Sequence, residues 1–248
     1  MDLPAIAGNN VRPFGRICIC GEFMSRLKMS IQQALEANDL DSIVSLAKKN
    51  RRVLTMLVRS AYDKETLAGW RAIKAVGLTA KALVKTDYEF LRETARKLLW
   101  SLSDESGGIG WSAPELLGEI VAVDPQRFSD IIPLIAGVYN IEENVFRSGV
   151  VYALGRIAEV SPELILPHRN IIMRALSETN PLTRVYALGV IRNTWRLESQ
   201  DNRQLLRNLI KGMAPDKREV FTYHNNGFIR VEVGAESVNI LSYLAKVG

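Results

Sequence analysis

Hydrophobic residues recur every three to four positions over most of the chain, from about residue 25 to residue 213. This spacing places them on one face of a helix, so it predicts a long series of amphipathic helices. Short polar segments separate them, and serine, aspartate or asparagine directly before proline, as at Asn180-Pro181, is typical of a helix start. We expect helices at 25–37, 40–49, 52–62, 64–85, 87–103, 112–123, 124–139, 144–160, 161–177, 180–197, 201–213 and 236–247.

The pattern changes near the C-terminus. The segments 219–224 and 228–233 are rich in β-branched and aromatic residues, and Asn225-Asn226-Gly227 lies between them. Asparagine and glycine suit the positive backbone angles of a tight turn, so this region predicts a β-hairpin. The hairpin over 219–233 either caps the last helix pair, closes over a groove or binds a partner.

The N-terminal residues have no lasting period. We interpret 1–24 as a tail with a short extended piece at 16–20, and 25–248 as a single helical domain that includes the hairpin. Cys18 and Cys20 are the two cysteines of the chain, and no nearby residues complete a metal site with them. We therefore expect a reduced, cytoplasmic protein without a metal or cofactor, a secretory signal or a membrane span.

One short pattern recurs inside four of the expected helices: a small or apolar residue, an apolar residue, glycine, any residue and usually isoleucine. Its glycines are Gly77, Gly118, Gly155 and Gly189, which lie 41, 37 and 34 residues apart. Glycine inside a helix costs about 1 kcal/mol relative to alanine, so its regular return suggests a shared packing reason, such as close approach of a partner helix. A period of this length is typical of a helical solenoid.

The Ala-Leu-Gly motif near the middle of alternate helices resembles the HEAT-like repeat family, including its short bacterial, phycobilisome-lyase-like version, over about 64–213. The segment 103–111, followed by Ala113-Pro114-Glu115, is similar to a stretch of a bacterial HEAT-repeat family. This resemblance implies an all-α, right-handed α-α superhelix, here with a small C-terminal β-hairpin. It also implies a binding scaffold without catalytic residues, in which the second helix of each pair lines the concave surface.

Aligning the four glycines separates two faces of these helices. Apolar positions beside the glycine face the core, and they include Ile73, Val76, Thr79, Val151, Leu154 and Ile157. The positions seven and three before glycine, then one and four after it, form a more polar stripe. The stripes are Trp70, Lys74, Leu78, Lys81; Trp111, Glu115, Glu119, Ala122; Ser148, Tyr152, Arg156, Glu159; and Leu182, Tyr186, Val190, Asn193.

The stripes predict a concave binding groove that carries Trp111, Glu115, Glu119, Tyr152, Arg156 and Tyr186. A structural alternative stays open at each position. Glu119 and Arg156 occupy equivalent places in adjacent repeats and can simply pair, which is worth about 0–1 kcal/mol if they are exposed. Lys74 and Glu115 can do the same, and Trp111 can pack in the core.

Two segments depart from the repeat and form further candidate sites. The glycine-rich loop with Asp104, Glu105, Gly107 and Gly108 suits a cation, a basic peptide, or acid–base chemistry by paired carboxylates. The alternative is an ordinary turn between helices. In the hairpin, Tyr223 and His224 lie near the tip, where the histidine is expected to serve as a turn residue.

The charge of the chain is unevenly distributed. Its net value is +5, but residues 1–100 carry +7, residues 101–170 carry −6 and residues 171–248 carry +4. Duplex-binding proteins usually present a continuous basic stripe to phosphate, and the acidic centre interrupts one here. Nucleic acid is therefore a weaker candidate partner than protein.

No catalytic signature such as Gly-x-Ser-x-Gly or His-Glu-x-x-His occurs in the chain. The sequence thus favours a non-catalytic scaffold that binds another protein. One alternative is a protein similar to the DNA glycosylases built from HEAT-like repeats, with Trp111, Glu115, Arg147 and Trp195 as loose counterparts. Another is a small-ligand or chromophore-lyase-type HEAT protein.

Overall fold

The computed structural model describes residues 15–102, 109–140 and 146–247, with side chains from Met24 onward except at 109 and 110. Twelve α-helices and one two-stranded sheet lie within these residues. The helices are α1 (Gly15–Glu36), α2 (Leu40–Lys49), α3 (Arg52–Ser60), α4 (Leu67–Leu83), α5 (Tyr88–Ser101), α6 (Ala113–Val121), α7 (Ile132–Val138), α8 (Arg147–Ala158), α9 (Arg169–Leu176), α10 (Pro181–Thr194), α11 (Gln200–Lys211) and α12 (Val233–Val247). The strands are β1 (Glu219–His224) and β2 (Gly227–Glu232).

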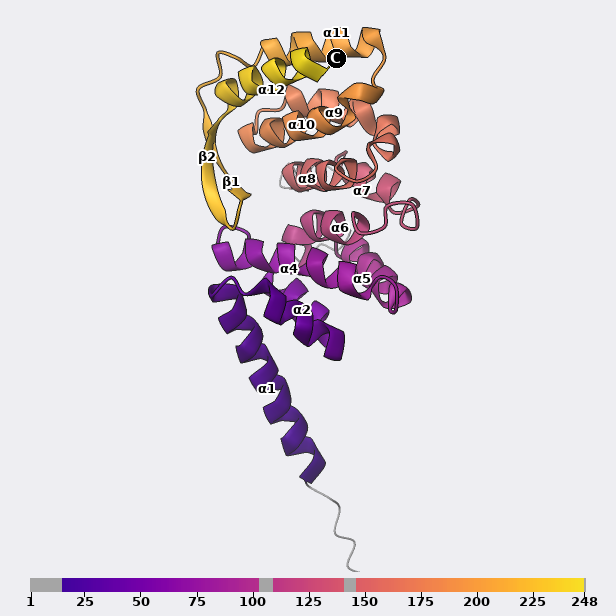
Figure 1. Ribbon diagram of the computed structural model, residues 1–248, viewed down its shortest axis with the longest axis vertical. Coiled ribbons are helices and arrows are strands. Elements are labelled where there is room, and N and C mark those ends of the chain that lie inside the picture. Colours follow the sequence, from indigo (N-terminus) through magenta and orange to yellow (C-terminus); the bar gives the residue numbers. More distant parts are fainter. Residues whose placement is uncertain (1–14, 103–108, 141–145, 248) are drawn as a thin grey trace, which may run out of the picture.

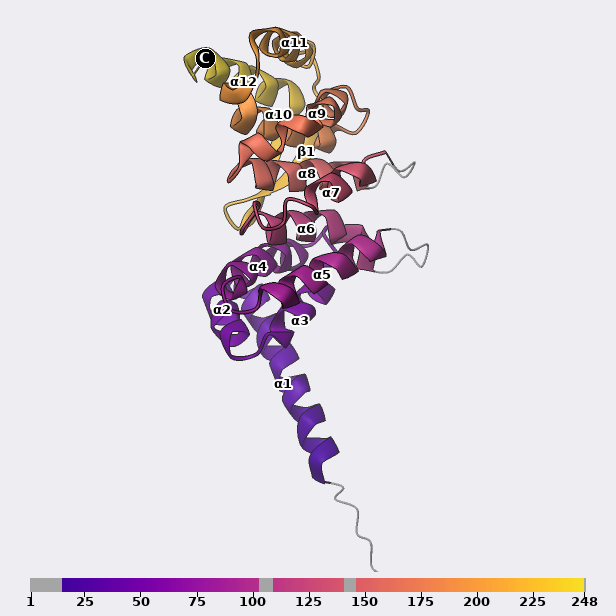
Figure 2. The same ribbon diagram turned by 90° about the vertical axis from the view of Figure 1, so that its right-hand side faces the viewer.

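The helices form stacked pairs in chain order. The pairs are α3–α4, α5–α6, α7–α8, α9–α10 and α11–α12, and the second helices of successive pairs pack side by side. In Figure 2, α5 and α7 lie on the side of the stack that faces away from the hairpin. The structure therefore confirms the all-α, HEAT-like array with a C-terminal hairpin.

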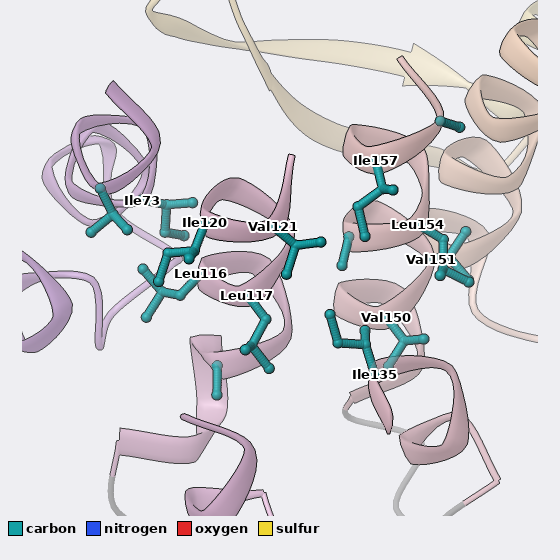
Figure 3. Packing of buried hydrophobic residues seen from close by; sticks show 14 of the residues in the cluster. Ile73, Leu116, Leu117, Ile120, Val121, Ile135, Val150, Val151, Leu154 and Ile157 are labelled. Carbon is teal, nitrogen blue, oxygen red and sulfur yellow. The ribbon is translucent and has the colours of Figure 1, made fainter. Parts of the chain in front are cut away.

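The core runs between the two layers of helices. Ile73 of α4 faces Leu116 and Ile120 of α6, and α6 in turn packs on α8 (Figure 3). The positions beside the repeated glycines that were predicted to face the core are all fully buried, as Val76 and Leu154 illustrate. The repeat register that the glycines define is therefore correct for the core.

The packing reason proposed for the glycines is only partly correct. A Cβ atom on Gly118 would lie 2.5 Å from the Cα atom of Ala153, so α6 and α8 touch through their backbones at this point. A Cβ on Gly155 would meet only an ordinary van der Waals contact, and nothing lies within 4 Å of a Cβ on Gly189. Close helix approach is confirmed for Gly118 and wrong for Gly155 and Gly189.

Three local expectations are wrong. The segment 16–20, expected to be extended, belongs to α1. The helix expected at 124–139 is reduced to Ile132–Val138, after a series of turns. The helix expected at 161–177 begins as two short 3-10 segments and becomes α9 only at Arg169, because Pro167 cannot donate a backbone hydrogen bond.

The hairpin has the two-residue turn expected from its sequence. Asn225 and Asn226 have positive φ angles of 46° and 67°, as a type I′ turn requires, and His224 pairs with Gly227. The strands run along one side of the stack from α12 to α4 (Figure 1). No helix among the described residues is long and apolar enough to cross a membrane.

Candidate functional site

Helices α4, α6, α8 and α10 present their stripes towards the hairpin, and we call this side of the array the inner face. Two neighbouring pockets lie on it. The larger, which we call the hairpin cleft, has a volume of about 750 Å³ and lies between α4, α6, α8 and the tip of the hairpin. The smaller, which we call the aromatic cavity, has a volume of about 180 Å³ and lies under both strands.

Most of the stripe residues line these two pockets. Those in the hairpin cleft are Lys74, Leu78, Lys81, Glu119, Ala122, Tyr152, Arg156 and Glu159. Those in the aromatic cavity are Trp70, Glu115, Ser148, Leu182 and Tyr186. Val190 is instead fully buried in the core. Residues from four repeats, more than 100 positions apart in sequence, are thus brought onto one surface.

Glu119 of α6 is the centre of a polar network on the floor of the hairpin cleft. Its Oε1 atom accepts hydrogen bonds from Lys74 Nζ at 2.6 Å, from the Tyr152 hydroxyl at 2.6 Å and from Arg156 Nε at 2.9 Å. Arg156 also pairs with Glu159. The pairing alternative is therefore correct, but the pair is not fully exposed, because the Glu119 side chain is 4% exposed and the Arg156 side chain 26%.

The network also fixes the protonation of its tyrosine. Burial and the neighbouring Glu119 carboxylate raise the pKa of Tyr152 well above its ordinary value. The hydroxyl therefore stays protonated and donates to Glu119. Together with Lys74 and Arg156, it joins α4, α6 and α8 through one oxygen atom.

Glu115, one turn earlier in α6, has a different partner from the one expected. It pairs with Lys64 at 2.9 Å, whereas Lys74 pairs with Glu119. Lys64 also donates to the backbone carbonyl of Trp111 at 3.1 Å. Glu115 is 2% exposed, and its buried Oε2 atom has no hydrogen-bond partner among the described residues. Both glutamates thus line the pockets of the inner face while being held by cationic side chains of the fold.

Aromatic rings cross the inner face between the two pockets. Trp70 packs edge-on against Tyr152 with 5.2 Å between ring centroids, and Tyr152 packs similarly against Tyr186 at 5.4 Å. Tyr223 of the hairpin stacks on Trp70 at 5.7 Å, and Phe228 packs edge-on against Tyr223. Each such pair contributes about 0.5–1.5 kcal/mol beyond its buried area. The aromatic row therefore holds the hairpin tip against α4.

The hairpin thus closes over the inner face, which was one of the three alternatives for it. Helix α12 packs on α10 and α11 and covers the end of the array. Tyr223 and His224 line the hairpin cleft together with the turn residues Asn225 and Asn226. His224 is exposed beside the turn, as expected.

The other predicted residues lie outside this arrangement. Trp111 is 42% exposed and does not belong to the described lining of either pocket. Asp104, Glu105, Gly107 and Gly108 lie outside the described residues, as do the side chains of both cysteines. Within the part of the chain that the structure describes, no group of three or more His, Cys, Asp or Glu is placed to hold a metal ion.

Four residues of the aromatic cavity were not selected from the sequence: Lys64, Glu65, Phe221 and Phe228. Lys64 precedes α4 and carries no repeat signal. The two phenylalanines were recognised only as apolar hairpin residues. Their place over Glu115 depends on the docking of the hairpin, which no local pattern specifies.

The four residues considered for a DNA-glycosylase-like site are not assembled. Trp195 is fully buried just after α10, and Arg147 forms an ion pair with Glu178 at 2.9 Å. Glu115 is held by Lys64. Each is thus engaged in local packing or pairing on a different element.

A further groove of about 740 Å³ lies between α1, α3 and α4. It is lined by Met24, Lys28, Ile31, Met56 and Arg59 among others. None of the stripe residues takes part in its described lining. The inner face therefore remains the surface on which the repeated positions converge.

No protein-family model and no curated protein sequence matches the chain. Among solved structures, the crystal structure of the archaeal HEAT-like repeats protein from Thermococcus onnurineus NA1 is similar over 89% of this chain and 97% of that chain. The TM-score is 0.37 and the sequence identity is 15%. The stacked helix pairs described above themselves give this chain a HEAT-like repeat fold.

Proposed function

We propose that the protein is a non-catalytic HEAT-like scaffold that binds a segment of another protein in the hairpin cleft. The observation that carries this proposal is a cleft of about 750 Å³ formed jointly by three repeats and the hairpin tip. Its border includes exposed apolar side chains, Leu78 at 42% and Val160 at 56% exposure. Such residues on an otherwise polar rim favour contact with a partner.

The shape of the cleft favours a polypeptide over a small molecule. Small-ligand pockets bury most of the ligand surface, whereas Leu78 and Val160 stand open to solvent at the cleft border. An extended segment can lie along such an opening and cover both residues. The hairpin then forms one wall of the binding site.

The charges of the cleft favour neither duplex nucleic acid nor acid–base chemistry. Lys74 and Arg156 are already paired with Glu119, so they are poorly placed to neutralise phosphates. Glu119 Oε1 accepts three hydrogen bonds, which leaves it a poor general base. A scaffold role needs neither function.

The test uses two leucines of similar exposure. Leu78 lies in the cleft, and Leu134 of α7, 55% exposed, lies on the side away from the hairpin. We expect Leu78→Glu to reduce the recovery of a specific partner from native extract more than about tenfold in quantitative affinity purification, while Leu134→Glu retains it. Equal recovery by both folded variants would contradict the proposal.

A further inference from the structure

The aromatic cavity has an unusual lining for its size. Ring faces or edges come from Trp70 of α4, Tyr186 of α10, Phe221 of β1 and Phe228 of β2. Its volume of about 180 Å³ corresponds to roughly six water molecules at liquid density. The cavity therefore accommodates the end of one side chain rather than a length of backbone.

The charged groups of the cavity include more carboxylates than ammonium groups. The Glu115 side chain is 3% exposed, and Lys64 bonds its Oε1 atom. Its Oε2 atom is enclosed next to Gly149 and has no hydrogen-bond donor among the described residues. Glu65 adds a second carboxylate to the lining. With Lys64 included, these three side chains carry one net negative charge. Because Oε2 has no accessible surface, the carboxylate acts on the cavity through its charge and not as an open hydrogen-bond acceptor.

We infer that the aromatic cavity binds an organic cation, the ammonium or guanidinium end of a lysine or arginine side chain of the partner held in the adjacent cleft. This inference rests on the proposed function. Aromatic faces attract cations through the negative charge of their π-systems. The net negative charge of the lining adds an electrostatic attraction for such a group.

The same lining disfavours other occupants. An anion would face two carboxylates, and the Lys64 ammonium is already engaged by Glu115 and by the Trp111 carbonyl. A purely apolar group would gain nothing from the net negative charge of the lining. The charge of Glu115 also contributes, with burial, to a raised pKa of Tyr186, which keeps that hydroxyl protonated beside the carboxylate.

The first experiment uses the full chain and a defined probe. Methylguanidinium chloride is titrated while the indole N–H resonances are followed by NMR, with sodium chloride at equal ionic strength as the control. We expect a saturable shift at Trp70 and none at Trp195, which is fully buried elsewhere. A Trp70 resonance that does not move up to about 100 mM probe, far above the range of weak binding, would overturn the inference.

Variants then separate a cation–π contact from a hydrophobic one. Phe221 is 66% exposed, so Phe221→Leu and Phe221→Tyr should both fold. We expect the Phe221→Leu variant to bind methylguanidinium about two- to five-fold more weakly than the Phe221→Tyr variant. Glu115→Gln should weaken it by about tenfold, because it removes one negative charge from the lining, with folding checked by thermal melting. Equal binding by the Leu and Tyr variants would overturn the cation–π role.

A final comparison identifies the source of the cation. Capped arginine (N-acetyl-arginine methylamide) is tested against capped citrulline, its neutral analogue, and against the free diamine putrescine. Binding of capped arginine and not of citrulline supports a partner side chain, whereas binding of putrescine alone overturns it. The cleft test with Leu78→Glu is independent of these probes, so failure here and failure of the scaffold proposal can be distinguished.

Discussion

The carboxylate of Glu119 occupies the space where a side chain at position 77 would lie. A Cβ atom on Gly77 would be 2.4 Å from Glu119 Oε2. The glycine of one repeat therefore makes room for the charged centre of the next. At this interface α4 and α6 are held together by the polar network as well as by apolar packing.

Replacing Gly77 with alanine should destabilise the fold. The new methyl group would displace the Glu119 carboxylate from its hydrogen bonds with Lys74, Tyr152 and Arg156. We expect a loss of about 1–3 kcal/mol in the free energy of unfolding, measured by urea denaturation, although alanine favours the helix.

Gly189→Ala is the matched control. This glycine also lies inside a helix, but nothing is within 4 Å of an added Cβ. The Gly189→Ala variant should gain about 0.5–1 kcal/mol in the free energy of unfolding, because alanine has the better helix propensity. If both alanine variants gained stability, the proposed reason for Gly77 would be wrong.

The buried charge of Glu119 should be essential for stability. Glu119→Gln keeps the volume but leaves Lys74 and Arg156 without their shared anion. We expect a loss of about 3–5 kcal/mol in the free energy of unfolding, measured by urea denaturation, as when one partner of a buried ion pair is removed. Glu159→Gln removes an exposed partner of the same Arg156 and should cost less than about 1 kcal/mol. Similar losses in both variants would refute the central role of Glu119.

Stacking of Tyr223 on Trp70 should determine how firmly the hairpin tip is held. Tyr223→Leu removes the ring, so we expect faster amide hydrogen exchange in β1 and β2. The increase should correspond to a loss of about 0.5–1.5 kcal/mol in the free energy of opening of the hairpin. Exchange in α6 should stay unchanged. Val238→Leu, at an exposed position of α12, serves as the control. Unaltered strand exchange in Tyr223→Leu would show that the tip is held by other contacts.

Asp216, between α11 and β1, should make the fold sensitive to acid. Hydrogen bonds from Arg218 lower its pKa from 3.8 to about 2. Because the folded-state pKa is the lower one, the carboxylate stabilises the protein above about pH 4, and this contribution is lost as the pH falls towards 2.

Comparison with Asp216→Asn isolates this effect. At about pH 6 the wild type should have a larger free energy of unfolding than the variant. At about pH 2.5 this difference should be smaller by about 1–2 kcal/mol. Urea denaturation at the two pH values measures it. A difference that is independent of pH would contradict the assigned interaction.

The repeated glycines were sufficient to predict the helical array and its core register, because periodic apolar positions such as Val76 and Leu154 depend mainly on local spacing. The hairpin turn was also predictable, since Asn225 and Asn226 suit positive φ angles. The short 3-10 segments before Arg169 were not, because proline shows an interruption without specifying its form.

The burial of Glu115 and Glu119 could not be read from the sequence. Polar residues on a helical stripe ordinarily indicate a solvated face, and their cationic partners lie 37 or more positions away. Docking of Tyr223 on Trp70 joins residues about 150 positions apart. These long-range contacts decide which stripe residues form the floor of the cleft and which remain open to a partner.

Site-specific photo-crosslinking tests the binding account most directly. A photoreactive phenylalanine derivative is placed at Leu78 or Val160 in the cleft and, as a control, at Leu134 on α7. The account predicts that both cleft positions crosslink to the same polypeptide in native cells, through a segment containing lysine or arginine, and that position 134 does not. Crosslinking to that polypeptide from position 134 alone, or from no position, would contradict it.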